Sequence, residues 1–191
     1  MVSKIAFFGI PAHGHTNPTL EVVKELVRRG QEIRYYSYDS LKEKIEVTGA
    51  EYISCDSYDI QMNLTPQDGE RIVKDIVFST EILVKTTLAM DDTIIDEISQ
   101  WKPDCIVADS MAMWGKLAAY KLSVPFMSST TTFAFNKHSA KIMKQDITQL
   151  FKMLFSIPKA NKLVKKLRAK GYPVKNVLSI VQNDNDTNTI V

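Results

Sequence analysis

The sequence predicts an α/β protein in which helices cover a parallel sheet. The apolar run at residues 4–9 is short and uninterrupted, as in strands that are buried on both faces. Leu20, Val23, Leu26 and Val27 follow at helical spacing, and charged residues occupy the other side of that helix. A β-rich stretch at 32–38 comes next. This alternation is typical of parallel sheets with right-handed crossovers.

The first part of the chain carries the turn and cap residues that such a pattern needs. Residues 10–16 hold one proline, one glycine and two histidines, so we expect a loop there. Asn17 can cap the first helix and Pro18 suits its first position, while Gly30 is suited to end it. The further predicted elements are a strand at 32–38, a second helix to about residue 47 that Asp39 or Ser40 caps and Gly49 ends, and a third strand from 52.

The remainder of the chain continues the alternation. A polar connection at 54–67 leads into a helical stretch at 69–100, which is either one helix or two helices broken near 89–92. The pattern predicts a Rossmann-like domain spanning residues 1–191. The later predicted elements are a strand at 104–108 ending at Asp109, a helix at 112–122, a strand at 124–127, a loop at 130–135, helices at 139–156, 160–170 and 177–181, and the start of a strand at 187–191. Because the last apolar pair enters a strand, we expect a fragment of a longer protein.

Composition narrows the function classes. The net charge of +2 gives no support for a nucleic-acid or membrane-surface partner. The two cysteines lack the spacing of zinc ligands and favour a reduced, cytoplasmic compartment. We expect no signal peptide and no membrane span. A late cluster of lysines is interpreted as a solvated helix face; it comprises Lys159, Lys162, Lys165, Lys166 and Lys170.

The loop after the first strand is the first candidate site, because ligands of such sheets bind beyond the carboxyl ends of the strands. Gly9 and Gly14 have the glycine spacing of a phosphate-binding P-loop, and Thr16 is placed for magnesium. However, His15 stands where that motif needs lysine. A dinucleotide fingerprint is also disfavoured. Asp39 could mimic its ribose-binding acid, but the required G-x-G-x-x-G is missing.

A third interpretation assigns catalysis to a histidine of this loop. The positive end of a helix dipole keeps a preceding imidazole neutral, as a general base requires. In the sheet order 3-2-1-4, Asp109 at the end of strand four lies beside the first loop, where its carboxylate could orient the imidazole. Structural alternatives stay open. His13 and His15 could only satisfy loop hydrogen bonds, and Asp109 could cap a helix starting near Met111.

Four stretches of the sequence resemble inverting glycosyltransferases of the macrolide and plant secondary-product type. Residues 11–20 resemble that family's first loop, with its G-H-x-N-P-x-L pattern, and 26–30 match the R-R-G that follows. Residues 102–109 resemble its P-D-x-[IV]-[IV]-x-D strand, and 121–126 its "lgvP" strand. The resemblance covers nearly the whole chain, in order.

The resemblance implies a GT-B fold, in which an N-terminal acceptor domain faces a C-terminal nucleotide-sugar domain across a cleft. It implies that His15 is the general base, that Asp109 orients it, and that His13 lies outside the pattern. The implied reaction is a single displacement from a UDP-sugar, with glucose as the expected sugar and no metal or cofactor. The family's donor signature is absent from this sequence. The donor-binding domain is therefore an expected partner, and the chain alone is expected to be inactive.

The implied acceptor is a small, apolar, hydroxylated molecule such as a macrolide or flavonoid, held among aromatic and polar side chains. Aromatic and Met residues at this spacing are also typical of a core, and the Ser/Thr run could cap a helix. Two rival functions remain: a non-catalytic subunit that needs a separate donor-binding partner, and a flavodoxin-like nucleotide- or flavin-binding module. The acceptor candidates are His13, Phe78, Met90, Met111, Met113, Trp114, Ser128, Ser129, Thr130, Phe133 and Phe135.

Overall fold

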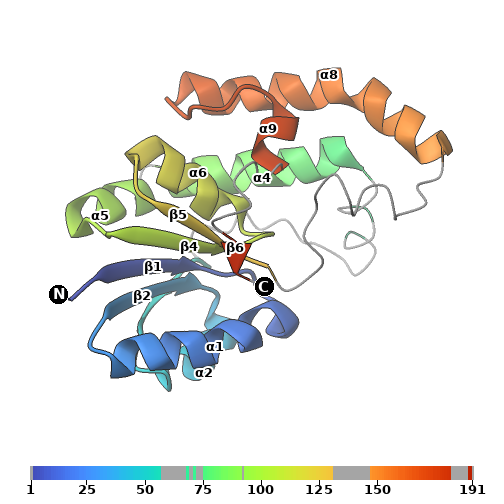
Figure 1. Cartoon of the computed structure of the whole chain (residues 1–191). Helices are drawn as coiled ribbons and strands as arrows, with labels where there is room; N and C mark the ends of the chain where they lie inside the picture. Colours follow the sequence, from blue (N-terminus) through green and yellow to red (C-terminus); the bar gives the residue numbers. More distant parts are fainter. Residues whose placement is uncertain are drawn as a thin grey trace.

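The computed structural model describes residues 2–56, 68, 71, 75–91, 93–130, 147–181 and 189–190. Its centre is a parallel sheet in the order β3-β2-β1-β4-β5-β6, which confirms the predicted 3-2-1-4 arrangement (Figure 1). The end of β4 therefore lies beside the loop that follows β1. The strands are β1 Lys4–Phe8, β2 Glu32–Ser37, β3 Glu51–Ser54, β4 Cys105–Asp109, β5 Phe126–Ser129 and β6 Thr189–Ile190.

Helices cover both faces of the sheet, in one layer on one face and in two layers on the other (Figure 1). One face carries α1 (His13–Arg28), the 3-10 helix η1 (Asp39–Leu41) and α2 (Lys42–Glu46). The other face carries α4, α5 and α6, and α8 and α9 lie outside these as a further layer. The bounds of this second group are α4 Ile76–Asp91, α5 Ile94–Trp101, α6 Met113–Leu122, α8 Ile147–Ala169 and α9 Val177–Val181.

Alternate residues of β1 build the cores of the two faces, because successive strand side chains point in opposite directions. Phe7 points toward α1 and stacks on Tyr35 of β2, with ring centroids 5.6 Å apart. Phe8 points toward α5 and α6 and stacks on Tyr36, with centroids 4.6 Å apart. Gly115 allows α6 to approach this second core closely, since a Cβ on Gly115 would lie 2.8 Å from both Ala108 and Phe8.

Buried polar contacts join the outer helices to the inner ones. The carboxylate of Asp91, at the end of α4, is 5% exposed and accepts hydrogen bonds from Lys121 of α6 and from the Tyr172 hydroxyl, the latter at 2.7 Å. The ammonium of buried Lys116 donates to the backbone carbonyl of Ile180 in α9 at 2.9 Å. These bonds accompany the apolar packing of α8 and α9 against α4 and α6.

The start of α1 corrects the sequence prediction. The helix begins at His13, four residues before the expected cap at Asn17, and Pro18 lies inside it. The carbonyl of Ala12 accepts the N–H groups of His15 at 3.1 Å and Thr16 at 3.0 Å, so the chain is already helical there. Pro18 lacks the N–H that would bond to the carbonyl of Gly14, so it removes one ladder bond, and α1 continues through it to Arg28. As predicted, Gly30 follows the end of α1, with a φ of +79°.

Asp39 is the second correction, because its carboxylate does not cap a helix. The hydroxyl of Ser54 donates to it at 2.7 Å and that of Tyr52 at 2.8 Å. These hydrogen bonds hold the pKa of Asp39 below its usual value. Gly49 ends this region as predicted, with a φ of +85°.

Three later boundaries also differ from, or decide between, the sequence predictions. The stretch expected at 69–100 is divided into α4 and α5 around residues 92–93. Strand β5 begins at Phe126, two residues later than expected. Helix α8 passes through Pro158, where a break was expected, because its second half packs continuously against α4. The short helix at 177–181 and the last strand are confirmed, whereas the expected loop at 130–135 and the start of the helix at 139 lie mostly outside the described residues.

Candidate functional site

A histidine and an aspartate meet at the carboxyl end of the sheet. His15 lies in the first turn of α1 and Asp109 is the last residue of β4. The Nδ1 atom of His15 lies 2.9 Å from Oδ2 of Asp109. The His15 side chain is 22% exposed and that of Asp109 is 3% exposed, so the imidazole stands between its buried partner and the surface.

The second carboxylate oxygen of Asp109 is bound as well. Oδ1 accepts the backbone N–H of Met111 at 2.8 Å, within the turn that connects β4 to α6. This turn contact resembles the predicted capping role, but α6 begins only at Met113 and no side chain caps it. The functional and structural interpretations of Asp109 are therefore compatible, because each uses a different oxygen. The two bonds together fix the orientation of the carboxylate.

This geometry determines which nitrogen of His15 can accept a proton. An ionised carboxylate only accepts hydrogen bonds, so its contact with Nδ1 places the imidazole proton on Nδ1. The lone pair of a neutral His15 ring is then on Nε2. An imidazole in this tautomer can take a proton from a hydroxyl group, and the adjacent carboxylate stabilises the imidazolium that results.

A buried hydroxyl pair lies beneath the turn that carries His15. Oγ1 of Thr19 donates to the carbonyl of Thr16 at 2.8 Å and lies 2.7 Å from the hydroxyl oxygen of Tyr35. The Tyr35 ring also underlies Gly9, where a Cβ would approach it to 3.1 Å. Burial, with a contribution from the charge of Asp109, raises the pKa of Tyr35, so this phenol stays neutral. Sequence analysis missed this pair, because no local pattern distinguishes it from ordinary core residues.

The other predicted histidine is placed differently. His13 is exposed, and its Nδ1 atom lies 3.4 Å from the ammonium of Lys44 in α2. His13 is therefore near the same edge of the sheet, but the contact described for it is with α2 and not with Asp109.

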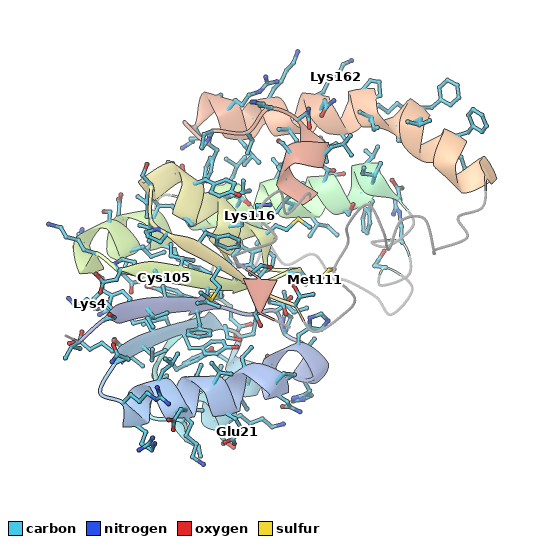
Figure 2. All side chains as sticks on the ribbon, viewed as in Figure 1. Lys4, Glu21, Cys105, Met111, Lys116 and Lys162 are labelled. Carbon is cyan, nitrogen blue, oxygen red and sulfur yellow. The ribbon has the colours of Figure 1, made fainter. Side chains whose placement is uncertain are left out.

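Several acceptor candidates gather at this edge. Met111 is 44% exposed and lies in the turn after Asp109. Its side chain is labelled in Figure 2. Ser128 and Ser129 end β5 next to β4, and Thr130 follows them, but Ser128 and Thr130 are buried. The carbonyl of Ser129 accepts the N–H of Ser110, which ties the ends of the two strands together.

The aromatic and methionine candidates other than Met111 lie in different surroundings. Trp114, in the first turn of α6, packs against the core around Phe8, and its buried indole N–H has no hydrogen-bond partner among the described residues. Phe78, in the first turn of α4, is covered by the guanidinium of Arg71 at 3.9 Å from the ring centroid. Met90 belongs to the core and Met113 packs in the outer layer. Phe133 and Phe135 lie outside the described residues.

The described part of the chain offers few other candidate sites. No group of three or more metal-ligating side chains occurs among those residues. None of the helices described has the length and apolarity needed to cross a membrane. Cys55 and Cys105 form no disulfide, and burial raises the pKa of Cys105.

Comparison with known proteins identifies relatives, although no family model matches the chain. An NDP-glycosyltransferase, YjiC, of Bacillus licheniformis is 34% identical over 137 residues, which are 70% of this chain and 34% of the relative. The demethyllactenocin mycarosyltransferase of Streptomyces fradiae is 29% identical over 73% of this chain and 32% of its own length. The crystal structure of the kitacinnamycin glycotransferase superposes with a TM-score of 0.70 at 20% identity, covering 94% of this chain and 43% of that one. The chain thus spans about a third of the length of these two curated relatives.

Proposed function

This chain is homologous to one domain of bacterial NDP- and UDP-glycosyltransferases of the GT-B fold, and we propose that it is their acceptor-binding half. The proposed reaction is an inverting transfer of a sugar, with glucose as the first candidate, from a UDP-sugar to a hydroxyl of a small hydrophobic acceptor. The observation that carries the proposal is the 2.9 Å contact between His15 and Asp109 at the carboxyl end of the sheet.

In the proposed mechanism, Nε2 of His15 removes the proton from an acceptor hydroxyl or phenol. The acceptor oxygen attacks the anomeric carbon of the donor as the bond to the nucleoside diphosphate breaks, so that configuration at that carbon inverts. The buried carboxylate of Asp109 holds the Nδ1 proton and stabilises the imidazolium. The proton taken by His15 then returns to solvent.

The acceptor is proposed to be apolar, flat and hydroxylated, of the macrolide or flavonoid kind. One relative is named a demethyllactenocin mycarosyltransferase and another an oleandomycin glycosyltransferase, which supports this class. Exposed Met111 supplies an adaptable apolar contact near the edge that carries Asp109. The buried indole N–H of Trp114, which has no hydrogen-bond partner among the described residues, is a proposed donor to the acceptor. Ser128, Ser129, Thr130, His13, Phe78 and Phe133 remain proposed acceptor contacts.

The donor sugar is proposed to be held by a second domain. The match covers about a third of the length of the Bacillus licheniformis relative, and the sequence lacks the donor signature expected of the family. The second domain could belong to the same polypeptide or to a separate chain, and in the latter case this chain acts as a binding subunit. Residues 1–191 then form the acceptor half in either arrangement.

The test is glycosyl transfer from UDP-glucose to a panel of flavonoid and macrolide hydroxyls. The chain is assayed together with a donor-binding domain, either within the full-length gene product or added in trans. We expect His15→Ala to lower kcat by on the order of a hundredfold or more. His13→Ala is the comparison variant: as a proposed acceptor contact that does not touch Asp109, it is expected to raise KM while kcat is largely kept. Circular dichroism verifies the fold of each variant.

Unchanged turnover in His15→Ala would contradict the assignment of the base and leave His15 with a structural role. Asp109→Asn sharpens the assay, because it preserves the shape of the side chain but cannot hold the charge of the imidazolium. Activity of residues 1–191 without any donor-binding domain would overturn the proposed division of labour between two domains.

A further inference from the structure

Helix α8 and the residues that follow it carry a strong imbalance of charge. Residues 147–175 contain eight lysines and arginines and no aspartate or glutamate, a charge of +8. Because the whole chain has a net charge of +2, the remaining residues together carry 2 − 8 = −6. The basic side chains are all exposed, and Figure 2 shows the labelled Lys162 on the side of α8 that faces away from the sheet.

The first half of α8 adds large apolar side chains to this basic surface. Phe151 is 57% exposed, Leu154 51% and Phe155 80%. Their exposure is notable because Ala160, Val164 and Leu167 of the same helix are fully buried against α4 and α6. The end of α8 that bears the phenylalanines extends past the carboxyl end of the sheet (Figure 1).

The apolar and basic side chains lie along one face of the helix. At 3.6 residues per turn, Phe155, Lys162 and Lys166 follow Phe151 along one side, and Lys165 follows Leu154. We refer to Phe151, Leu154, Phe155, Lys159, Lys162, Lys165 and Lys166 as the α8 outer face. Basic side chains thus continue the line that the exposed phenylalanines begin.

We propose that the α8 outer face docks on the surface of an anionic phospholipid bilayer. Basic residues beside a bilayer are attracted to anionic headgroups, and Phe and Leu side chains of interfacial helices enter the boundary between headgroups and acyl chains. Stable attachment of a peripheral protein generally takes two such signals, and this helix supplies both. The negative charge of the remaining chain opposes any other orientation on the same bilayer. This docking is independent of the proposed transferase reaction.

A bilayer fits these observations better than a polyanion such as nucleic acid. A polyanion would neutralise the lysines but offer no apolar environment to Phe151, Leu154 and Phe155. A bilayer accommodates both groups at once, since the exposed apolar side chains and the lysines that follow them lie along one face of the helix. The docking is peripheral, with the helix lying in the plane of the interface.

Co-sedimentation of the whole chain with vesicles tests the proposal. We expect binding to phosphatidylcholine vesicles that contain phosphatidylglycerol to exceed binding to pure phosphatidylcholine by about tenfold, and to weaken as salt is added. The triple change Lys162→Glu, Lys165→Glu and Lys166→Glu is expected to abolish this preference. The matched control reverses three exposed lysines elsewhere, Lys24→Glu, Lys42→Glu and Lys102→Glu, and is expected to retain most of the binding.

The apolar contribution is tested separately. Phe151→Ser combined with Phe155→Ser is expected to reduce vesicle binding severalfold, and these exposed positions leave the core unchanged. Phe155→Trp is expected to give a blue shift of tryptophan fluorescence when anionic vesicles are added, which the unsubstituted chain, with Trp101 and Trp114 alone, does not show. Equal binding to both kinds of vesicle, equal loss in the lysine control, or no effect of the two serines would overturn the proposal. So would binding to heparin without binding to vesicles.

Discussion

The two faces of the sheet are covered in different ways. On the face of Phe7, the helices α1 and α2 pack directly on the strands and form one layer. On the face of Phe8, α4, α5 and α6 form a first layer, and α8 and α9 pack on the outside of it. Buried charges occur between the two layers of the second face, where Asp91 and Lys116 lie.

The difference shows which interactions hold the helices in place on each face of the sheet. A single helical layer on a sheet needs one apolar stripe per helix, and hydrophobic burial positions it. A second layer must be positioned on helices that also pack inward, and directional hydrogen bonds fix where it docks. The candidate catalytic pair lies between the faces, since His15 comes from a helix of the first and Asp109 precedes a helix of the second.

The largest expected effect comes from removing the carboxylate between the layers. Asp91→Ala leaves Lys121 and Tyr172 without their shared acceptor, so we expect a loss of about 3 kcal/mol in the free energy of unfolding. Urea denaturation measures it, and exposed Asp96→Ala is the control. Hydrogen exchange is expected to quicken in α8 and leave β2 unchanged. An equal increase in the hydrogen-exchange rates of α8 and β2 would contradict the distinction between the two faces.

A smaller effect is expected where α6 approaches the sheet. The Cβ in Gly115→Ala would lie 2.8 Å from Cβ atoms of Phe8 and Ala108, which the backbone holds in place. We expect a loss of about 2 kcal/mol in the free energy of unfolding, from overpacking. Gly14→Ala is the matched control, since no heavy atom lies within 4 Å of its added Cβ and alanine favours a helix. Equal stability of both variants would show that α6 moves freely on the sheet.

The smallest effect is expected on the single-layer face. Tyr35→Phe removes the hydroxyl that contacts Thr19 but keeps the ring stacked on Phe7. Thr19 still donates to the carbonyl of Thr16, so we expect a loss of about 1 kcal/mol. Thermal denaturation of Tyr35→Phe, of Thr19→Val and of the double variant measures whether the two effects are additive. A loss as large as that of Asp91→Ala would show that this face also depends on polar contacts.

Sequence analysis predicted the features that depend on local pattern and sheet order. The buried strands read as apolar runs, and the order 3-2-1-4 alone placed Asp109 beside the loop of His15. It misplaced the start of α1, since the carbonyl of Ala12 caps that turn and no side chain marks it.

Features that depend on distant contacts were not predictable in the same way. Pro158 suggested a break that the packing of α8 on α4 overrides. The pairing of Tyr35 with Thr19 joins a strand to a helix, and the bond from Lys116 to Ile180 spans 64 residues. Such contacts follow from the assembled fold, so residue periodicity carries no signal for them. The exposure of Phe151 and Phe155 was missed for the same reason, because the sequence pattern favours burial of phenylalanine.

The adjacency of β1 and β4 has a consequence for the order of events during synthesis. His15 and Asp109 are 94 residues apart in the chain, and two further strands and several helices are made between them. Pairing over such a separation costs loop-closure entropy before the contact between the two strands has formed. It is therefore expected late in folding. A growing chain can form β1, α1 and β2 while its histidine still lacks a carboxylate. The proposed base is therefore oriented for proton transfer only after β4 has joined the sheet. A polypeptide that stops before Asp109 is expected to lack catalytic activity.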